Sequence, residues 1–179
     1  MQAWIGNLAA YNNGSLRGEW IEISTDADDV AAEIARICGD VEHYIGDYDG
    51  APGAATWLGE YASAATLAAT ARLMLAIEEN APAEHVDAIF ARMIESTYRP
   101  DIDALADDAA EWIADNFAGC FDSLEDFAAD LMEQTGELEA MPERLRNYFD
   151  FAAYGRDLEL GGDVSTTRTS AGLVIFWNR

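Results

Sequence analysis

Residues 101–116 read DIDALADDAAEWIADN, a stretch in which apolar and acidic positions separate at helical spacing. Ile102, Leu105 and Ala109 fall on one face of a helix, and Trp112 and Ile113 continue that face. The opposite face carries acids at positions 101, 103, 107, 108, 111 and 115. The pattern therefore predicts a helix over 101–116 that buries an apolar stripe and exposes a charged one.

The acidic character continues beyond this helix. Residues 101–140 contain thirteen acids and no basic residue. Acids recur every fourth residue from Asp103 to Asp115 and again from Asp122 to Asp130, so like charges become neighbours on a helix surface. Each such pair costs about 0.2–0.5 kcal/mol, and folding gives no reason to keep the series. We therefore interpret the negative surface as functional.

The charge is large and unevenly distributed over the 179 residues. The net charge is −24 and half of the residues are hydrophobic, which favours a folded core over disorder. All ten cations are Arg; residues 25–50 have eight acids against one Arg, whereas residues 141–179 have five of each. Such a chain is expected to be repelled by nucleic acid and by anionic membranes, and to bind basic surfaces.

Short strands and helices are predicted on the N-terminal side of this helix. The alternating and turn-forming segments predict strands at 2–9, 17–23 and 43–48 and a turn at 11–15. A helix is expected to start at Asp26 after a cap at Ser24 or Thr25. Residues 57–98 have helical periodicity, with one helix ending at Asn80 and Pro82 opening the next.

On the C-terminal side, Gly119 is expected to break the chain and Ser123 to cap another helix. A short helix is predicted at 150–158, and a closing hairpin is formed by 164–168 and 173–177. The predicted fold class is α+β. Three small domains are expected: an α+β domain with an antiparallel sheet at 1–55, a helical domain at 56–100, and an α+β domain with the acidic helices and a dimer-forming segment at 101–179.

The sequence contains no motif for catalysis or for metal binding. His43 and His85 have no carboxylate or Cys at ligand spacing; His43 is predicted to be structural and His85 exposed. Cys38 and Cys120 are predicted to be buried thiols. We therefore predict no catalytic residue, no cofactor and no metal, while a hydrolase using a carboxylate pair stays an alternative. The absence of a signal peptide and of a membrane span predicts a cytoplasmic protein.

Two explanations of the acidic surface differ in their consequences. A halophile-type structural protein would use carboxylates to hold water, but it would be expected to acidify residues 141–179 as well. Imitation of DNA is the second explanation. The six acids of residues 101–115 span about 21 Å of helix, or about one charge per 3.5–4 Å, and one DNA strand carries about one charge per 3.4 Å.

Several segments together resemble the ArdA-type antirestriction proteins of plasmids, transposons and phages. They are LAAYNNGSLRGEWI at 8–21, DYDG at 47–50, FAGCFDSLEDFA at 117–128, PERLRNYFDF at 142–151 and the run from Arg156 to Asp163. The resemblance covers nearly the entire chain. It implies an elongated homodimer of three-domain subunits whose acidic surface imitates bent DNA.

The resemblance also implies a function without catalysis. Proteins of this type bind the DNA groove of Type I restriction–modification enzymes, whose methyltransferase core is then the partner, and block restriction and often modification. A mimic directed at another basic DNA-binding protein is an alternative. The predicted mimic face consists of Asp26, Asp28, Asp29, Asp47, Asp49, Asp101, Asp103, Asp107, Asp108, Glu111, Asp115, Asp122, Asp126, Asp130 and Glu133. The residues implied at the dimer interface are Arg144, Leu145, Tyr148, Phe149 and Phe151.

Overall fold

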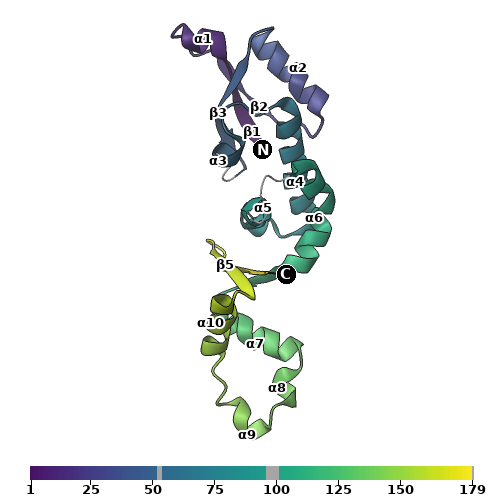
Figure 1. The fold of residues 1–179 in the computed structure, drawn as a ribbon, viewed down its shortest axis with the longest axis vertical. Coiled ribbons are helices and arrows are strands. Elements are labelled where there is room, and N and C mark those ends of the chain that lie inside the picture. Colours follow the sequence, from purple (N-terminus) through teal and green to yellow (C-terminus); the bar gives the residue numbers. More distant parts are fainter. Residues whose placement is uncertain (52–53, 96–100, 179) are drawn as a thin grey trace. The chain divides into compact units, whose positions relative to one another are not determined.

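The computed structural model describes residues 1–51, 54–95 and 101–178, which form two compact units, Met1–Glu111 and Trp112–Arg179 (Figure 1). Each unit contains one three-stranded antiparallel sheet together with helices. This combination confirms the predicted α+β class. The finer division into three domains stays a prediction.

The sheet of the first unit has the strand order β2-β1-β3, and both of its pairings are antiparallel. Its strands are β1 (Gln2–Asn7), β2 (Gly18–Glu22) and β3 (His43–Asp49). The three strands predicted from the sequence are therefore confirmed, each with slightly different bounds. Periods of two and flanking turn residues were sufficient to find them.

The strand β1 ends earlier than predicted because a short helix, α1 (Leu8–Asn12), follows it directly. The Asn7 side chain caps α1 by accepting a hydrogen bond from the Ala10 N–H at 2.9 Å. The same side chain donates to the carbonyl of Cys38 at 3.2 Å, which explains why an Asn is buried here. The turn predicted at 11–15 is therefore wrong at its start, where residues 11 and 12 are helical.

Helices make up most of the rest of the first unit. They are α2 (Ala27–Cys38), α3 (Ala54–Leu58), α4 (Ala64–Asn80), the 3-10 helix η1 (Ala83–His85), α5 (Val86–Glu95) and α6 (Ile102–Asn116), whose last residues belong to the second unit. The cap of α2 is Asp26, whose carboxylate accepts the Asp28 N–H at 2.8 Å, so the predicted cap at Ser24 or Thr25 is wrong.

Two further expectations for this unit are settled by η1. The helix α4 ends at Asn80 as predicted, but Pro82 precedes a 3-10 turn instead of opening an α-helix. His85 closes that turn and is only 6% exposed, so the expectation that it lies on the surface is wrong. The sequence misled because a polar residue in a first helical turn is usually solvated.

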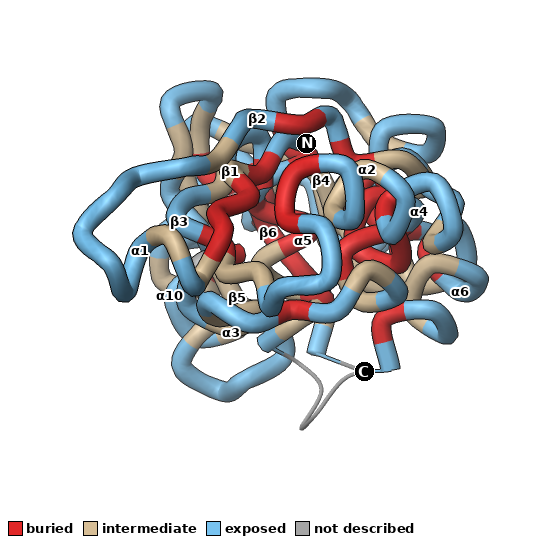
Figure 2. The backbone as a smooth tube through the Cα atoms, turned by 90° about the horizontal axis from the view of Figure 1, so that it is seen from above, coloured by how far each residue is buried: buried red, intermediate tan, exposed pale blue. Residues whose placement is uncertain are grey.

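The core of the first unit lies between one face of the sheet and the helices α2 and α4. Ala3 and Ile5 from β1 belong to the same buried cluster as Val30 and Ile37 from α2 and Leu67 from α4. The buried parts of the backbone are red in Figure 2. Burial of these side chains is the main source of stability for this unit, since each Val, Ile or Leu side chain contributes about 1.5–3 kcal/mol.

The sheet of the second unit has the order β4-β6-β5, with β4 (Phe117–Phe121), β5 (Val164–Arg168) and β6 (Leu173–Trp177). The strands β5 and β6 form the predicted hairpin with the predicted bounds. The predicted break at Gly119 is wrong, because this residue lies inside β4. Gly119 has a φ of +129° next to a shift in the pairing register with β6, a conformation that favours glycine.

The helices of the second unit beyond α6 are α7 (Leu124–Gln134), α8 (Glu137–Ala140), α9 (Glu143–Arg146) and α10 (Phe151–Gly161). Ser123 caps α7 as predicted, and α10 extends the predicted helix at 150–158. The core contains Phe127 of α7, whose ring lies 5.3 Å from that of Phe121 and 5.6 Å from that of Trp177.

The helices α7 and α10 approach closely because α10 has a glycine at the contact. A Cβ on Gly155 would collide with the backbone carbonyl of Leu124, whereas a Cβ on Gly161 would meet only the Asp163 carboxylate at 3.4 Å. Both glycines belong to the same helix. They therefore form a matched pair for testing the packing.

We expect Gly155→Ala to lower the free energy of unfolding by about 1–3 kcal/mol, since it forces the two helices apart. Gly161→Ala should be neutral or should raise that free energy by up to about 1 kcal/mol, because alanine favours a helix. Urea denaturation followed by circular dichroism measures both. Equal losses in the two variants would contradict the close contact between α7 and α10.

Candidate functional site

The structure places the predicted acidic residues on the surface. Of the fifteen acids predicted for the mimic face, fourteen are exposed and only Asp130 is partly buried. On α6 the apolar stripe points inward, with Ile102, Ala109 and Ile113 buried. The exposed acids of that helix are Asp103, Asp107, Asp108, Glu111 and Asp115. The division of α6 into an apolar and an acidic face is therefore confirmed.

Some of these acids have structural roles at helix starts. The Asp26 carboxylate caps α2, as described above. The Asp101 carboxylate caps α6 by accepting from the N–H groups of Asp103 at 3.2 Å and Ala104 at 3.3 Å. The Asp126 carboxylate accepts from the Ser123 hydroxyl, which in turn accepts the Asp126 N–H. At these positions an acid is explained by capping and by the positive end of the helix dipole.

Other acids of the predicted face accept hydrogen bonds without capping a helix. Asp29 accepts from the Ser24 hydroxyl at 3.2 Å, and Asp47 from the Tyr48 N–H at 2.9 Å. Asp130 accepts from the Gln134 amide at 2.6 Å. These carboxylates remain available to a partner on their second oxygen.

Arginine neutralises acids mainly in the first unit. Arg72 forms an ion pair with Asp103, and Arg36 lies 2.8 Å from the carboxylate of Glu19 and 3.0 Å from that of Glu33. The hydrogen bond and charge of Arg36 lower the pKa of Glu19. In the second unit, Arg146 and Arg168 donate to backbone carbonyls instead.

The remaining acids of the predicted face have no partner among the residues that the structure describes. Within the described ranges, no hydrogen bond or ion pair involves the carboxylates of Asp28, Asp49, Asp107, Asp108, Glu111, Asp115, Asp122 and Glu133. Four of these eight lie on α6. Because no cation of the described ranges offsets the repulsion among these acids, they are the best candidates for binding a basic surface.

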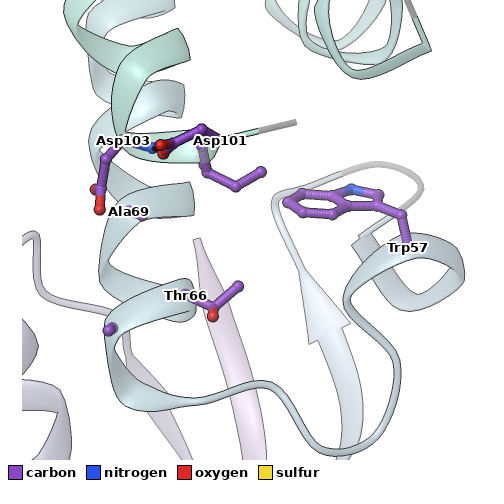
Figure 3. A pocket seen from close by; sticks show the side chains of 7 residues that line it. Trp57, Thr66, Ala69, Asp101 and Asp103 are labelled. Carbon is purple, nitrogen blue, oxygen red and sulfur yellow. Dashed lines mark hydrogen bonds between the residues drawn. The ribbon is translucent and has the colours of Figure 1, made fainter. Parts of the chain in front are cut away.

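A hollow of about 410 Å³ lies beside the start of α6 within the first unit. Trp57 of α3 lies across this hollow from Asp101 and Asp103, and Thr66 and Ala69 of α4 also line it (Figure 3). Both acids already have partners, as a helix cap and as the ion pair with Arg72. The hollow therefore adds no unpaired charge to the surface.

The segment predicted for the dimer interface is exposed only in part. Leu145 is 47% exposed and Tyr148 is 84% exposed, and Arg144 is also on the surface. Phe149 packs inward within its own unit, with its ring 4.9 Å from Phe151 and 5.7 Å from Tyr154. Phe149 and Phe151 are thus half-buried and support the segment that presents Leu145 and Tyr148.

The titratable groups that could do chemistry are placed separately. His43 lies 3.1 Å from the carbonyl of Ala62 through its Nε2 atom, in line with the structural role predicted for it. Cys38 is buried, and burial raises the pKa of its thiol, whereas Cys120 is only half-buried. Over the described ranges, no group of three or more His, Cys, Asp or Glu is arranged to hold a metal ion, and no helix is long and apolar enough to cross a membrane.

Sequence reasoning missed one group of surface residues, the aromatic side chains on the open face of the first sheet. Trp20 is 47% exposed and Tyr11 is 54% exposed. The ring of Tyr44 lies 5.7 Å from that of Trp4 and 5.0 Å from that of Tyr11. The alternation of Trp4 and Trp20 with buried neighbours was a signal that could have found this face.

A comparison with protein families gives a match over most of the chain. The model described as Antirestriction protein (ArdA) matches residues 3–172. The chain belongs to the ArdA family. The family consists of non-enzymatic antirestriction proteins, so membership implies inhibition of restriction enzymes. A search of curated proteins found no match.

The two roles of acids in this ArdA chain can be separated on α6. We expect Asp101→Ala to lower the free energy of unfolding by about 0.5–2 kcal/mol, because it removes the helix cap. Asp115→Ala should raise it by about 0.3–1 kcal/mol at low salt, since it removes an unpaired anion from the negative end of the helix. Thermal denaturation at two salt concentrations measures both changes.

The salt dependence provides the control for that comparison. The gain from Asp115→Ala should shrink in about 1 M NaCl, where charges are screened over about 3 Å. The loss from Asp101→Ala should persist, because it comes from direct hydrogen bonds to the N–H groups of Asp103 and Ala104. A loss of stability in both variants would show that Asp115 also has a structural role.

Proposed function

We propose that this ArdA protein is a DNA mimic that occupies the DNA groove of a Type I restriction–modification enzyme and so blocks restriction, and modification with it. Incoming DNA would escape cleavage because the enzyme's groove is already filled. The observation that carries the proposal is the set of unpaired, exposed acids on and after α6. Such a surface is suited to a partner that supplies the missing positive charges.

The spacing of charges along α6 supports imitation of a phosphate strand. The acids from Asp101 to Asp115 extend over about 21 Å, given a rise of about 1.5 Å per residue. They supply about one charge per 3.5–4 Å, close to the value of about 3.4 Å for one strand of duplex DNA. A basic groove that binds DNA phosphates would therefore meet about the same linear charge density on α6 as on a DNA strand.

DNA and the proposed mimic would compete for the same groove, so a competition assay tests the proposal. The protein is titrated against a purified Type I methyltransferase core with labelled DNA bound, at several salt concentrations. We expect competitive displacement of the DNA that weakens steeply with added salt, because both ligands bind through charge. If the protein displaces the DNA at none of these salt concentrations, the proposal is wrong for this enzyme. Other basic DNA-binding proteins would then remain as targets.

Group neutralisation identifies the acids that matter. The variant Asp107→Asn/Asp108→Asn/Glu111→Gln/Asp115→Asn should weaken displacement at least about tenfold, since several charge contacts are lost together. Its matched control is Glu78→Gln/Glu79→Gln/Glu84→Gln/Asp87→Asn, which removes the same charge from exposed acids outside the predicted face. Equal losses in the two variants would show that only net charge matters and would contradict a defined mimic face.

We further propose that Arg144, Leu145, Tyr148, Phe149 and Phe151 form the dimer interface. The near-neutral charge of residues 141–179 supports this, because two copies of a strongly acidic surface would repel each other. Leu145 and Tyr148 supply exposed apolar area next to the half-buried aromatic pair. The acidic surfaces of the two copies would then remain free for the enzyme.

Substitution of the exposed pair tests self-association. We expect Leu145→Asp/Tyr148→Asp to convert the dimer to a monomer, because it places charge on apolar contact area. Leu160, which is 77% exposed on α10, gives the control Leu160→Asp, which should stay dimeric. Sedimentation equilibrium measures the mass of each. If the double variant remains dimeric, the dimer interface must lie on another part of the surface.

A further inference from the structure

The first sheet has an open face opposite its core. In β1, Ala3 and Ile5 are buried against the helices, so Gln2 and Trp4 point to the other side. In β2, Ile21 is buried, so Trp20 and Glu22 point to the same side as Trp4. The register agrees, because Trp20 pairs with Trp4 and Glu22 pairs with Gln2. This open face therefore carries two tryptophans.

The indole of Trp4 lies flat against three glycines, one from each strand. A Cβ on Gly6, Gly18 or Gly46 would lie 2.6, 2.6 or 2.7 Å from atoms of the Trp4 ring, closer than carbon atoms can approach. Each strand thus has a residue without a side chain at this point, which allows the Trp4 ring to lie directly on the backbone. The ring that covers the glycines is that of Trp4. Trp20 does not take part in this contact and is 47% exposed.

A register shift brings two carboxylates onto the same face. Ile5 pairs with Ile45, but Trp4 pairs with Asp47, so β3 has one extra residue between these pairs. Without it, strict alternation from Ile45 would point Asp47 into the core and Tyr48 outward. With it, Tyr48 packs against the core and donates to the carbonyl of Gly59 at 2.7 Å, where burial raises its pKa to about 12.

The pairing then defines two rows of side chains across the open face. Trp20, Trp4 and Asp47 form one row, and Glu22, Gln2 and Asp49 form the next. Neighbours in a row have Cβ atoms about 4.5–5.5 Å apart. A hollow of about 480 Å³ lies between them, lined by Gln2, Trp20, Asp47, Tyr48 and Asp49. An exposed indole and two carboxylates therefore face one space, and none of these lining residues is a cation.

We propose that this hollow binds an arginine side chain of the partner protein, a proposal that rests on the basic partner of the proposed function. A guanidinium is planar, so it can stack on the Trp20 indole while its N–H groups bind Asp47 or Asp49. A lysine ammonium can pair with the carboxylates but cannot stack in the same way. The site therefore selects arginine, in addition to the general attraction for positive charge.

Nucleic-acid bases could also stack on exposed aromatic rings, but the charges on this face oppose them. Glu22, Asp47 and Asp49 surround the tryptophans, and each would repel a phosphate. Glu22 does not line the hollow, which leaves Asp47 and Asp49 as the carboxylates for the guanidinium. A cationic side chain is thus the occupant that the charge favours.

The test uses the complete protein and two blocked peptides of equal charge, one with arginine and one with lysine at alternate positions between serines. Isothermal titration at about 0.15 M salt limits nonspecific binding to the acidic surface. We expect the arginine peptide to bind about two- to fivefold more tightly, the range that exposed cation–π contacts produce. The indole N–H signal of Trp20 should shift with the arginine peptide in NMR spectra.

Matched variants locate the site. Trp20→Thr should make the two peptides bind equally, whereas Tyr61→Thr, which removes another exposed aromatic residue of the same unit, should keep the preference. Asp47→Asn/Asp49→Asn should weaken arginine binding more than Asp40→Asn/Asp87→Asn, which removes the same charge elsewhere in the unit. Melting curves confirm that each variant is folded, and if Trp20→Thr unfolds, the aspartate pairs and the Trp20 signal decide.

Equal binding of both peptides to the unmodified protein, or a preference that Trp20→Thr leaves intact, would overturn the proposal. So would tighter binding of a single-stranded oligonucleotide than of the arginine peptide. DNA displacement from the methyltransferase core without any arginine preference would refute this site and leave DNA mimicry standing. An arginine preference without displacement would refute mimicry for that enzyme and leave the site standing.

Discussion

Burial of apolar side chains inside each unit has to overcome the mutual repulsion of acidic residues in a chain with a net charge of −24. The repulsion is concentrated where the chain has no basic residue, and there the helices depend on their inner faces. α6 is fixed by Ile102, Ala109 and Ile113, and α7 by Phe127 and Met132. Because apolar contacts are insensitive to charge, they allow the outer faces of both helices to carry several acids and no basic residue.

The same constraint explains why the acids differ in their surroundings. Acids at helix starts, such as Asp26, Asp101 and Asp126, cap helices and are stabilised by the helix dipole. Acids in the middle and at the end of α6 have neither a cap to form nor a basic neighbour within the described residues. Under the proposed function, a basic partner would supply the positive charge that these acids lack among the described residues, so binding would also stabilise the folded chain.

Much of the fold could be predicted from the sequence because periodicity and caps are local signals. The Ser123 cap, the end of α4 at Asn80 and the hairpin of β5 and β6 follow from neighbouring residues alone. The failures have non-local causes. Asn7 caps α1 while its amide reaches the distant Cys38 carbonyl, and Gly119 lies in a strand because β6 pairs with it.

The candidate site divides in the same way. That the acids of α6 are exposed could be predicted, since a helix with one apolar stripe must solvate its other side. Which acids are unpaired could not, because the ion pair of Arg72 with Asp103 joins residues far apart in the sequence. The face of the sheet on which Asp47 lies could not be predicted from the sequence either, because it depends on one extra residue in β3.

The two kinds of surface would act over different distances, so each would have a separate role in the proposed recognition. Unpaired carboxylates attract a basic groove over about a Debye length, close to 8 Å at physiological salt, and raise the rate of encounter without fixing orientation. The indole of Trp20 acts only in contact, where a stacked guanidinium has a defined direction. An acidic surface alone would bind many basic proteins. The open sheet face, where the glycines under Trp4 and the shift in β3 fix the positions of rings and carboxylates, adds the short-range geometry that a choice among such partners requires.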